Sequence, residues 1–237
     1  MVSTSYQMHL RTYLSLDLIK SAAFFARKAH EYEQSDKPTN PKQKVDFLAE
    51  HKSFVLGSIF KSVTFLEALI NEIYCDINEN VDKFDNVNKS KLELISRLWD
   101  KGIPRTASYP ILQKYEIFLD LLDKDEFNRG VEFYSNAKFL IILRNALIHF
   151  EPESILADVT PPSDPKDKHK FEKYLKGKFN ENPFTGDGNP FYPDKCLGHG
   201  CAEWSVKSSL EFTDVFFKKI NEEPDYDIIR TSLKTKS

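Results

Sequence analysis

Glycine is scarce in this chain, with 8 residues in 237, and long stretches contain no turn-forming residue. A multi-stranded sheet needs frequent turns, so this scarcity argues against one and favours long helices. Hydrophobic residues make up 41% of the chain, which excludes general disorder and is enough to fill a substantial core. The composition alone therefore predicts an all-α fold.

Cysteine and long hydrophobic runs are also scarce. The three cysteines are an odd number in a chain too large to depend on disulfide bonds, so no disulfide framework is expected and a reducing cytoplasm fits. The N-terminus carries no basic region followed by an uninterrupted apolar run, and we expect no stretch to approach the roughly 18 apolar residues of a membrane span. The sequence predicts a soluble, cytoplasmic protein without a membrane anchor.

The chain has no excess of positive charge. Charged residues make up 29% of it and the formal net charge is −3, so no global basic field attracts nucleic acid. Any contact with RNA must therefore come from a local patch.

Apolar residues recur at spacings of three and four along most of the chain, as they do in amphipathic helices. This periodicity predicts helices at about residues 12–34, 41–80, 89–102, 111–123, 130–150 and 201–221. The second helix is the longest and carries Leu48, Ile59, Ile70 and Ile77 on one stripe. We expect it to be the spine of the fold.

Residues 151–200 have a different composition. They contain seven of the 12 prolines and five of the 8 glycines, which predicts a loop-rich insertion with one short basic helix near residues 164–176. We therefore expect a single helical domain. Its core spans about residues 12–150, the insertion about 151–200, and a C-terminal helix at about 201–221 docks back on the core.

The segment LRNALIHF, residues 143–150, places a permanent charge in an apolar stripe. Arg144 lies four residues after Leu140 and three before Leu147, so it interrupts the buried face of its helix. Burying an unpaired guanidinium would be very costly. Arg144 therefore needs a partner carboxylate, a hydrated subunit interface or an anionic ligand.

The spacing of the polar residues in this segment favours a site shared between two chains. Asn145 and His149 are four residues apart and share a helix face, whereas Arg144 and His149 diverge by roughly 140° around the helix. A second copy of the helix across a two-fold axis would bring one chain's Arg144 near the other's His149. Two-fold dimers are the commonest oligomers, so we expect a homodimer.

The arginine, the polar Asn145, three further residues and His149 resemble the motif of the HEPN family, an arginine and a histidine separated by four to six residues. The long helix contains SVTFLEALINEIY, residues 62–74, which is similar to the long helix of many bacterial HEPN proteins. The resemblance covers about residues 45–150. It implies a HEPN-like helical bundle that dimerises with the motif at its cleft, often an RNase in a toxin–antitoxin or phage-defence system.

This resemblance implies that Arg144 and His149 are catalytic, that Asn145 supports them, that RNA is the substrate and that an antitoxin protein is a candidate partner. The chemistry agrees, because metal-independent RNA cleavage needs a proton-exchanging group near neutral pH and a cation for the developing negative charge. Attack of the 2′-hydroxyl would give a 2′,3′-cyclic phosphate. No cofactor and no metal is expected.

Two alternatives remain open from the sequence. One is a non-catalytic HEPN module that binds RNA, a nucleotide or a partner protein. The other is a helical scaffold in which His149 caps its helix and Arg144 forms a core ion pair. Glu67 is the most natural partner for Arg144, in one chain or across the dimer interface, because it also interrupts the apolar stripe of its own helix.

Residues 166–178 are the most basic stretch, with six lysines against two acidic residues. Such a run can position a phosphate backbone, although a solvated helix face is the commoner explanation. The candidate RNA-binding residues in it are Lys166, Lys168, Lys170 and Lys173.

Cys196, His199 and Cys201 have the side chains of metal ligands but lack a fourth member, so we expect them to pack structurally rather than bind zinc. Trp204, Phe212 and Phe216 are expected in the core, and Cys75 is expected to be a buried apolar residue rather than a nucleophile.

Overall fold

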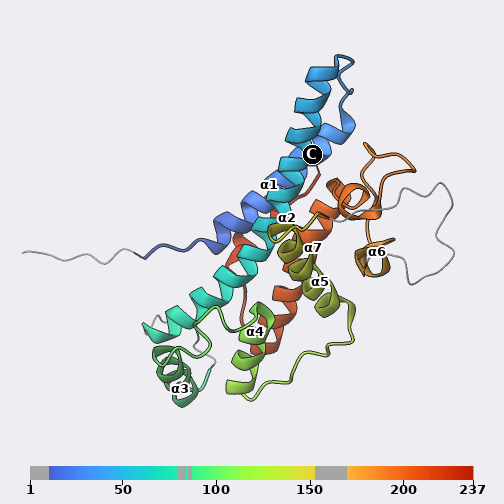
Figure 1. The fold of residues 1–237 in the computed structure, drawn as a ribbon. Helices are drawn as coiled ribbons and strands as arrows, with labels where there is room; N and C mark the ends of the chain where they lie inside the picture. Colours follow the sequence, from blue (N-terminus) through green and yellow to red (C-terminus); the bar gives the residue numbers. More distant parts are fainter. Residues whose placement is uncertain (1–10, 80–83, 85–86, 153–169, 237) are drawn as a thin grey trace, which may run out of the picture.

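A computed structural model describes residues 11–79, 84, 87–152 and 170–236 (Figure 1). These residues form helices and connecting loops, without a sheet, so the predicted all-α fold is confirmed. The α-helices are α1 (Ser15–Gln34), α2 (Pro41–Asn78), α3 (Lys89–Asp100), α4 (Ile111–Leu121), α5 (Glu132–Ile148), α6 (Lys170–Leu175) and α7 (His199–Ile220). A short irregular helical turn (Phe191–Lys195) and a 3-10 helix (Asp225–Ser232) accompany them.

The helices α1 and α2 form a long antiparallel hairpin that projects beyond the rest of the protein (Figure 1). Four buried alanines of α1, at positions 22, 23, 26 and 29, let the two helices approach closely. Asn40 begins α2, because its side chain accepts hydrogen bonds from the backbone N–H groups of Lys42 and Gln43 and Pro41 occupies the first helical position. The long helix is the spine, as the sequence predicts.

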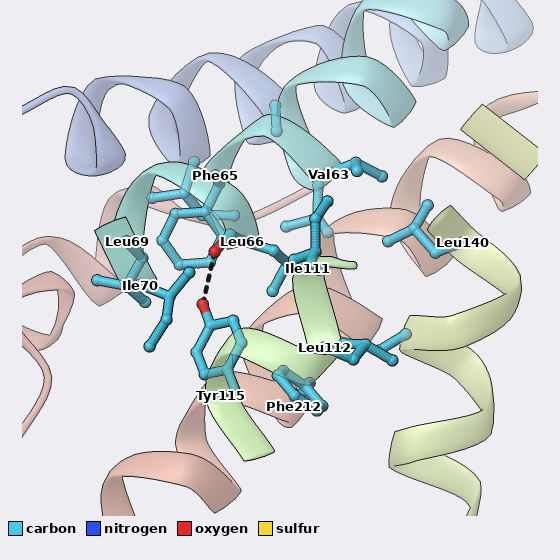
Figure 2. Close-up of a cluster of buried hydrophobic side chains, with 14 of the residues drawn as sticks. Val63, Phe65, Leu66, Leu69, Ile70, Ile111, Leu112, Tyr115, Leu140 and Phe212 are labelled. Carbon is cyan, nitrogen blue, oxygen red and sulfur yellow. Dashed lines mark hydrogen bonds between the residues drawn. The ribbon is translucent and has the colours of Figure 1, made fainter. Parts of the chain in front are cut away.

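Tyr115 of α4 joins three helices in the core. Its hydroxyl donates a 2.6 Å hydrogen bond to the Leu66 carbonyl of α2 (Figure 2), and its ring meets Phe212 and Phe216 of α7 edge to face. Leu140 of α5 belongs to the same buried cluster. Trp204, Phe212 and Phe216 are all buried, which confirms their expected core role.

The long helix α2 corrects one expectation about hydropathy. It contains an 18-residue window with mean hydropathy 1.6, so a segment with the length and composition of a membrane span does exist. Half of that window is buried inside the protein, and α2 packs against α1, α3 and α7. This environment fits that of a core helix.

The second half of the insertion is ordered around the start of α7. Gly198 and Gly200 lie so close to Asn182 and Asn180 that a Cβ atom on either glycine would come within 3.0 Å of backbone atoms. On the other side, Tyr174 of α6 stacks on Phe139 of α5 with ring centroids 4.3 Å apart. The insertion therefore connects the start of α7 to the outer side of α5.

Candidate functional site

The helix α5 carries the arginine–histidine motif and is apolar on more than its buried side. Ala137, Leu140 and Leu143 are fully buried against the core, while Ile141 and Ile142 on the outer side are only partly buried. A helix that is apolar on most sides is usually covered on most sides. The outer face of α5 is therefore a surface that can receive a ligand or another chain.

Asn145 and His149 stand on this outer face, one turn apart, and both are exposed. His149 ends α5, where its backbone N–H donates a 2.9 Å hydrogen bond to the Asn145 carbonyl. Ile148 and Phe150 beside it are 52% and 48% exposed. His149 is therefore open to solvent, and it also holds the helix-capping position that the scaffold alternative predicts.

Arg144 is partly buried and has no partner in the described part of the chain. Its Nε atom is buried without a hydrogen-bond acceptor, and no ion pair reaches its guanidinium from residues 11–79, 84, 87–152 or 170–236. The sequence allowed three environments for Arg144. The first of them, a partner carboxylate, is not found among the described residues. A hydrated surface, a second chain or an anionic ligand is compatible with this partly buried position.

The predicted ion pair between Glu67 and Arg144 is wrong within the chain. Glu67 instead accepts from the ammonium group of Lys114, with Nζ and Oε1 3.1 Å apart, and Asn71 accepts from the same group at 3.1 Å. The physical reason is burial, since Lys114 is 1% exposed and a buried ammonium needs an anion nearby. A signal for Lys114 exists in the sequence, where it lies three residues after Ile111 on an apolar stripe.

The basic stretch is described only from residue 170 onward, so Lys166 and Lys168 lie outside the described residues. Lys170 and Lys173 are exposed on α6, which packs beside α5. The run is partly neutralised further along. Lys176 pairs with Glu172 at 3.0 Å, and Lys178 reaches Glu132 and Asn136 of α5.

A groove of about 520 Å³ lies between α4 and α5. At one end Glu116 accepts both a two-pronged contact from Arg129, at 3.0 and 3.1 Å, and a 2.8 Å hydrogen bond from the Tyr134 hydroxyl. Burial and the adjacent Glu116 raise the pKa of Tyr134 to about 12, so its hydroxyl stays protonated at neutral pH. The groove was not foreseen, because only the packing of two distant segments creates it.

The CLGHGC segment anchors the start of α7. The His199 ring donates from Nε2 to the Thr235 carbonyl at 3.0 Å, and its backbone N–H donates to Glu33 at 2.6 Å. Cys196 and Cys201 are buried, and burial raises the pKa of both thiols, that of Cys196 to about 12. In the described part of the chain, no three His, Cys, Asp or Glu side chains are grouped to hold a metal ion.

Cys75 is only partly buried, so its expected full burial is corrected. Its thiol lies on α2, and burial is the main cause that raises its pKa. A thiol with a raised pKa is a poor nucleophile at neutral pH.

The end of α5 thus carries an exposed His149, an exposed Asn145 and an Arg144 without a partner among the described residues, with a groove along the same helix. The sequence matches no protein-family model, no curated protein and no solved structure. What the chain does is therefore inferred from the chemistry of these groups.

Proposed function

We propose that this chain is a homodimeric, metal-independent endoribonuclease of the HEPN type, with Arg144, Asn145 and His149 as its catalytic site. One observation carries the proposal. An arginine without a partner among the described residues adjoins an exposed amide and lies five residues before an exposed histidine. A stability role would pair the arginine and enclose the histidine, whereas an anionic substrate needs both groups available.

The cleavage step assigns each residue a part. The ribose 2′-oxygen attacks the adjacent phosphorus and the bond from phosphorus to the 5′-oxygen breaks. The 2′-hydroxyl loses its proton, and the leaving 5′-oxygen gains one. His149 exchanges a proton with one of these oxygens, because imidazole is the side chain that titrates near neutral pH. Arg144 stabilises the extra negative charge on the phosphoryl oxygens, and Asn145 orients the phosphate by hydrogen bonding.

The surroundings of His149 support the proposed dimer. Ile148 and Phe150 are each about half exposed, and exposed apolar side chains beside a polar site are typical of an interface. Arg144 and His149 point to different sides of one helix, so pairing two α5 helices across a two-fold axis would bring Arg144 of one chain to His149 of the other. The substrate would then bind in the cleft between the chains.

The HEPN resemblance supplies the biological setting of the proposal. Such an RNase would act in the cytoplasm, in a toxin–antitoxin or phage-defence system, and an antitoxin protein would be its partner. Lys170 and Lys173 of α6, exposed beside α5, would contact the RNA backbone outside the cleft.

The decisive experiment compares purified wild-type chain with His149→Ala on a labelled RNA oligonucleotide. The variant should cleave at least roughly 10²-fold more slowly, the usual effect of losing a positioned proton-exchanging group, with unchanged helicity and dimerisation. The products should carry 2′,3′-cyclic phosphate ends. The matched control is Lys20→Ala, which removes an exposed lysine of α1; equal activity of His149→Ala and this control would refute catalysis.

A non-catalytic binding module is the second candidate, favoured by the groove of about 520 Å³ along α5. Its volume suits a nucleotide-sized ligand. Wild-type chain that binds the RNA oligonucleotide but leaves it intact would select this function.

A further inference from the structure

Lys138 is an exposed cation on the outer face of α5. It precedes Asn145 by seven residues and His149 by eleven, which places all three on one face of the helix, two and three turns apart. No ion pair or hydrogen bond occupies Lys138 within the described residues. Its charge is therefore available to an anion that also reaches the motif.

Lys138 also borders the groove between α4 and α5. Phe139 and Ile142 give this groove an apolar wall, and Gln113 and Ser135 add groups that can donate or accept hydrogen bonds. The acidic residue in the groove, Glu116, is already neutralised by Arg129. The groove therefore combines an apolar surface, polar groups and one free cation at its edge.

We propose that this groove is a nucleotide subsite, in which Lys138 contacts a phosphate and the groove receives an unpaired base of the RNA strand that is cut at His149. The inference rests on the proposed RNase function and narrows its substrate to single-stranded RNA. The strand runs along α5, from the groove at Lys138 toward the exposed end of the helix.

The chemistry of the groove matches a nucleotide. Tyr174 covers one face of the Phe139 ring, so a flat base would gain contact energy on the remaining apolar wall, including Ile142. Its polar edge would meet Gln113 and Ser135. The volume of about 520 Å³ falls within the range of pockets that hold small ligands. A base in a duplex is stacked and paired and cannot enter, so the groove selects single strands.

The first test measures binding without cleavage. The full-length His149→Ala chain is titrated with a fluorescent single-stranded RNA oligonucleotide and with the same sequence as a duplex. Adding Lys138→Ala should weaken binding of the single strand roughly 10-fold. It should also reduce the slope of log K against log salt concentration by about 1, the effect of one lost phosphate contact. The matched control is Lys20→Ala, which removes an exposed lysine from α1.

The second test fills the groove and measures cleavage. Ile142→Trp in the wild-type chain should raise KM roughly 10-fold, by the size of a lost base contact. It should leave kcat nearly unchanged, because His149 lies about two turns further along the helix and Arg144 points to the opposite side of it. A merely structural role for Ile142 would lower the melting temperature without this division between KM and kcat. Light scattering on each variant measures whether the dimer is retained.

The outcomes separate the subsite from the RNase proposal. Weaker binding by Lys138→Ala supports the subsite even if the wild-type chain proves unable to cut RNA. Cleavage by the wild-type chain with both variants equal to Lys20→Ala overturns the subsite and leaves the RNase intact. Dissociation of the dimer by Lys138→Ala or Ile142→Trp also overturns it, since the groove would then be part of the subunit interface.

Discussion

The carboxylate of Glu67 lies 3.1 Å from the ammonium group of Lys114, a side chain that is 1% exposed. Asn71 accepts a second hydrogen bond from the same ammonium group. These contacts engage the carboxylate of Glu67, which is expected from the sequence to pair with Arg144. Among the described residues, the charges in the apolar stripes thus divide into a structural pair, Glu67 with Lys114, and Arg144, which has no carboxylate partner there.

Replacing Glu67 should destabilise the protein through Lys114. In Glu67→Ala the buried ammonium would keep only Asn71, and an uncompensated buried charge is costly. Because the Glu67 side chain is 38% exposed, we expect a loss of about 1–3 kcal/mol in the free energy of unfolding, less than for a fully buried pair. Urea denaturation measures it. The double variant with Lys114→Met should recover most of the loss, and an unchanged stability of Glu67→Ala would contradict the pairing.

Arg144→Ala should remove RNA cleavage while leaving the fold intact. Because no carboxylate of the described residues pairs with Arg144, its removal leaves no buried anion behind, and the free energy of unfolding should change by less than about 1 kcal/mol. Arg144→Lys should restore little activity, since an ammonium lacks the planar fork that contacts two phosphoryl oxygens. Thermal denaturation and the RNA cleavage assay are run on the same samples. A large loss of stability would assign Arg144 to the core instead.

The helices could be predicted from the sequence because their apolar periodicity is strong. The predicted ends of α1, α2, α4, α5 and α7 lie within three residues of those observed. The 3-10 helix at Asp225–Ser232 was not predicted, since eight residues are too few to show an apolar period. Its one buried side chain, Tyr226, is held by hydrogen bonds to Thr213 and Asp214. Such tertiary contacts produce no periodic pattern of apolar residues in the sequence.

The site could be predicted only in its local part. Helix geometry alone places Asn145 and His149 on one face, and the structure shows both exposed there. The partner of Glu67 could not be chosen, because Lys114 and Arg144 both interrupt apolar stripes and only the packing of α4 on α2 decides between them. The groove at Lys138 depends in the same way on how α4 meets α5.

Mixing two inactive variants should restore cleavage if the site is shared across the two-fold axis. A dimer of one Arg144→Ala chain and one His149→Ala chain keeps one intact site, formed by Arg144 of the second and His149 of the first. Random exchange makes half of the dimers mixed, each with one of two sites, so activity should return to about a quarter of wild type. Light scattering confirms the dimer. No recovery from a verified mixed dimer would place the complete site within one chain.

Cleavage should survive removal of metal ions. In the proposed mechanism the positive charge that stabilises the negative phosphoryl oxygens comes from Arg144, and His149 moves the proton. Activity of the purified protein should be the same in excess EDTA and in Mg²⁺, measured on the same RNA oligonucleotide at constant ionic strength. Loss of cleavage in EDTA, with recovery on adding Mg²⁺ or Mn²⁺, would refute this division of roles.

Acidification should loosen the C-terminal segment through His199. Burial lowers the pKa of this imidazole below its ordinary 6.5, against opposing effects of the Thr235 carbonyl, Glu33 and Glu203. The unfolded chain therefore binds the proton more readily than the folded one. Stability is fully present above about pH 6.5 and falls as the pH drops from there toward the lowered pKa of the folded state.

The measurement is the melting temperature of the wild-type chain and of His199→Gln, at pH 7.5 and at pH 5.5. Glutamine keeps an N–H donor for the Thr235 carbonyl but does not titrate, so the variant should lose less stability between the two pH values than the wild type. Other titrating groups near His199, including His30 at 4.7 Å between ring centroids and Glu33, are present in both chains and cancel in the difference. An equal fall in both chains would show that His199 does not set the acid sensitivity of the fold.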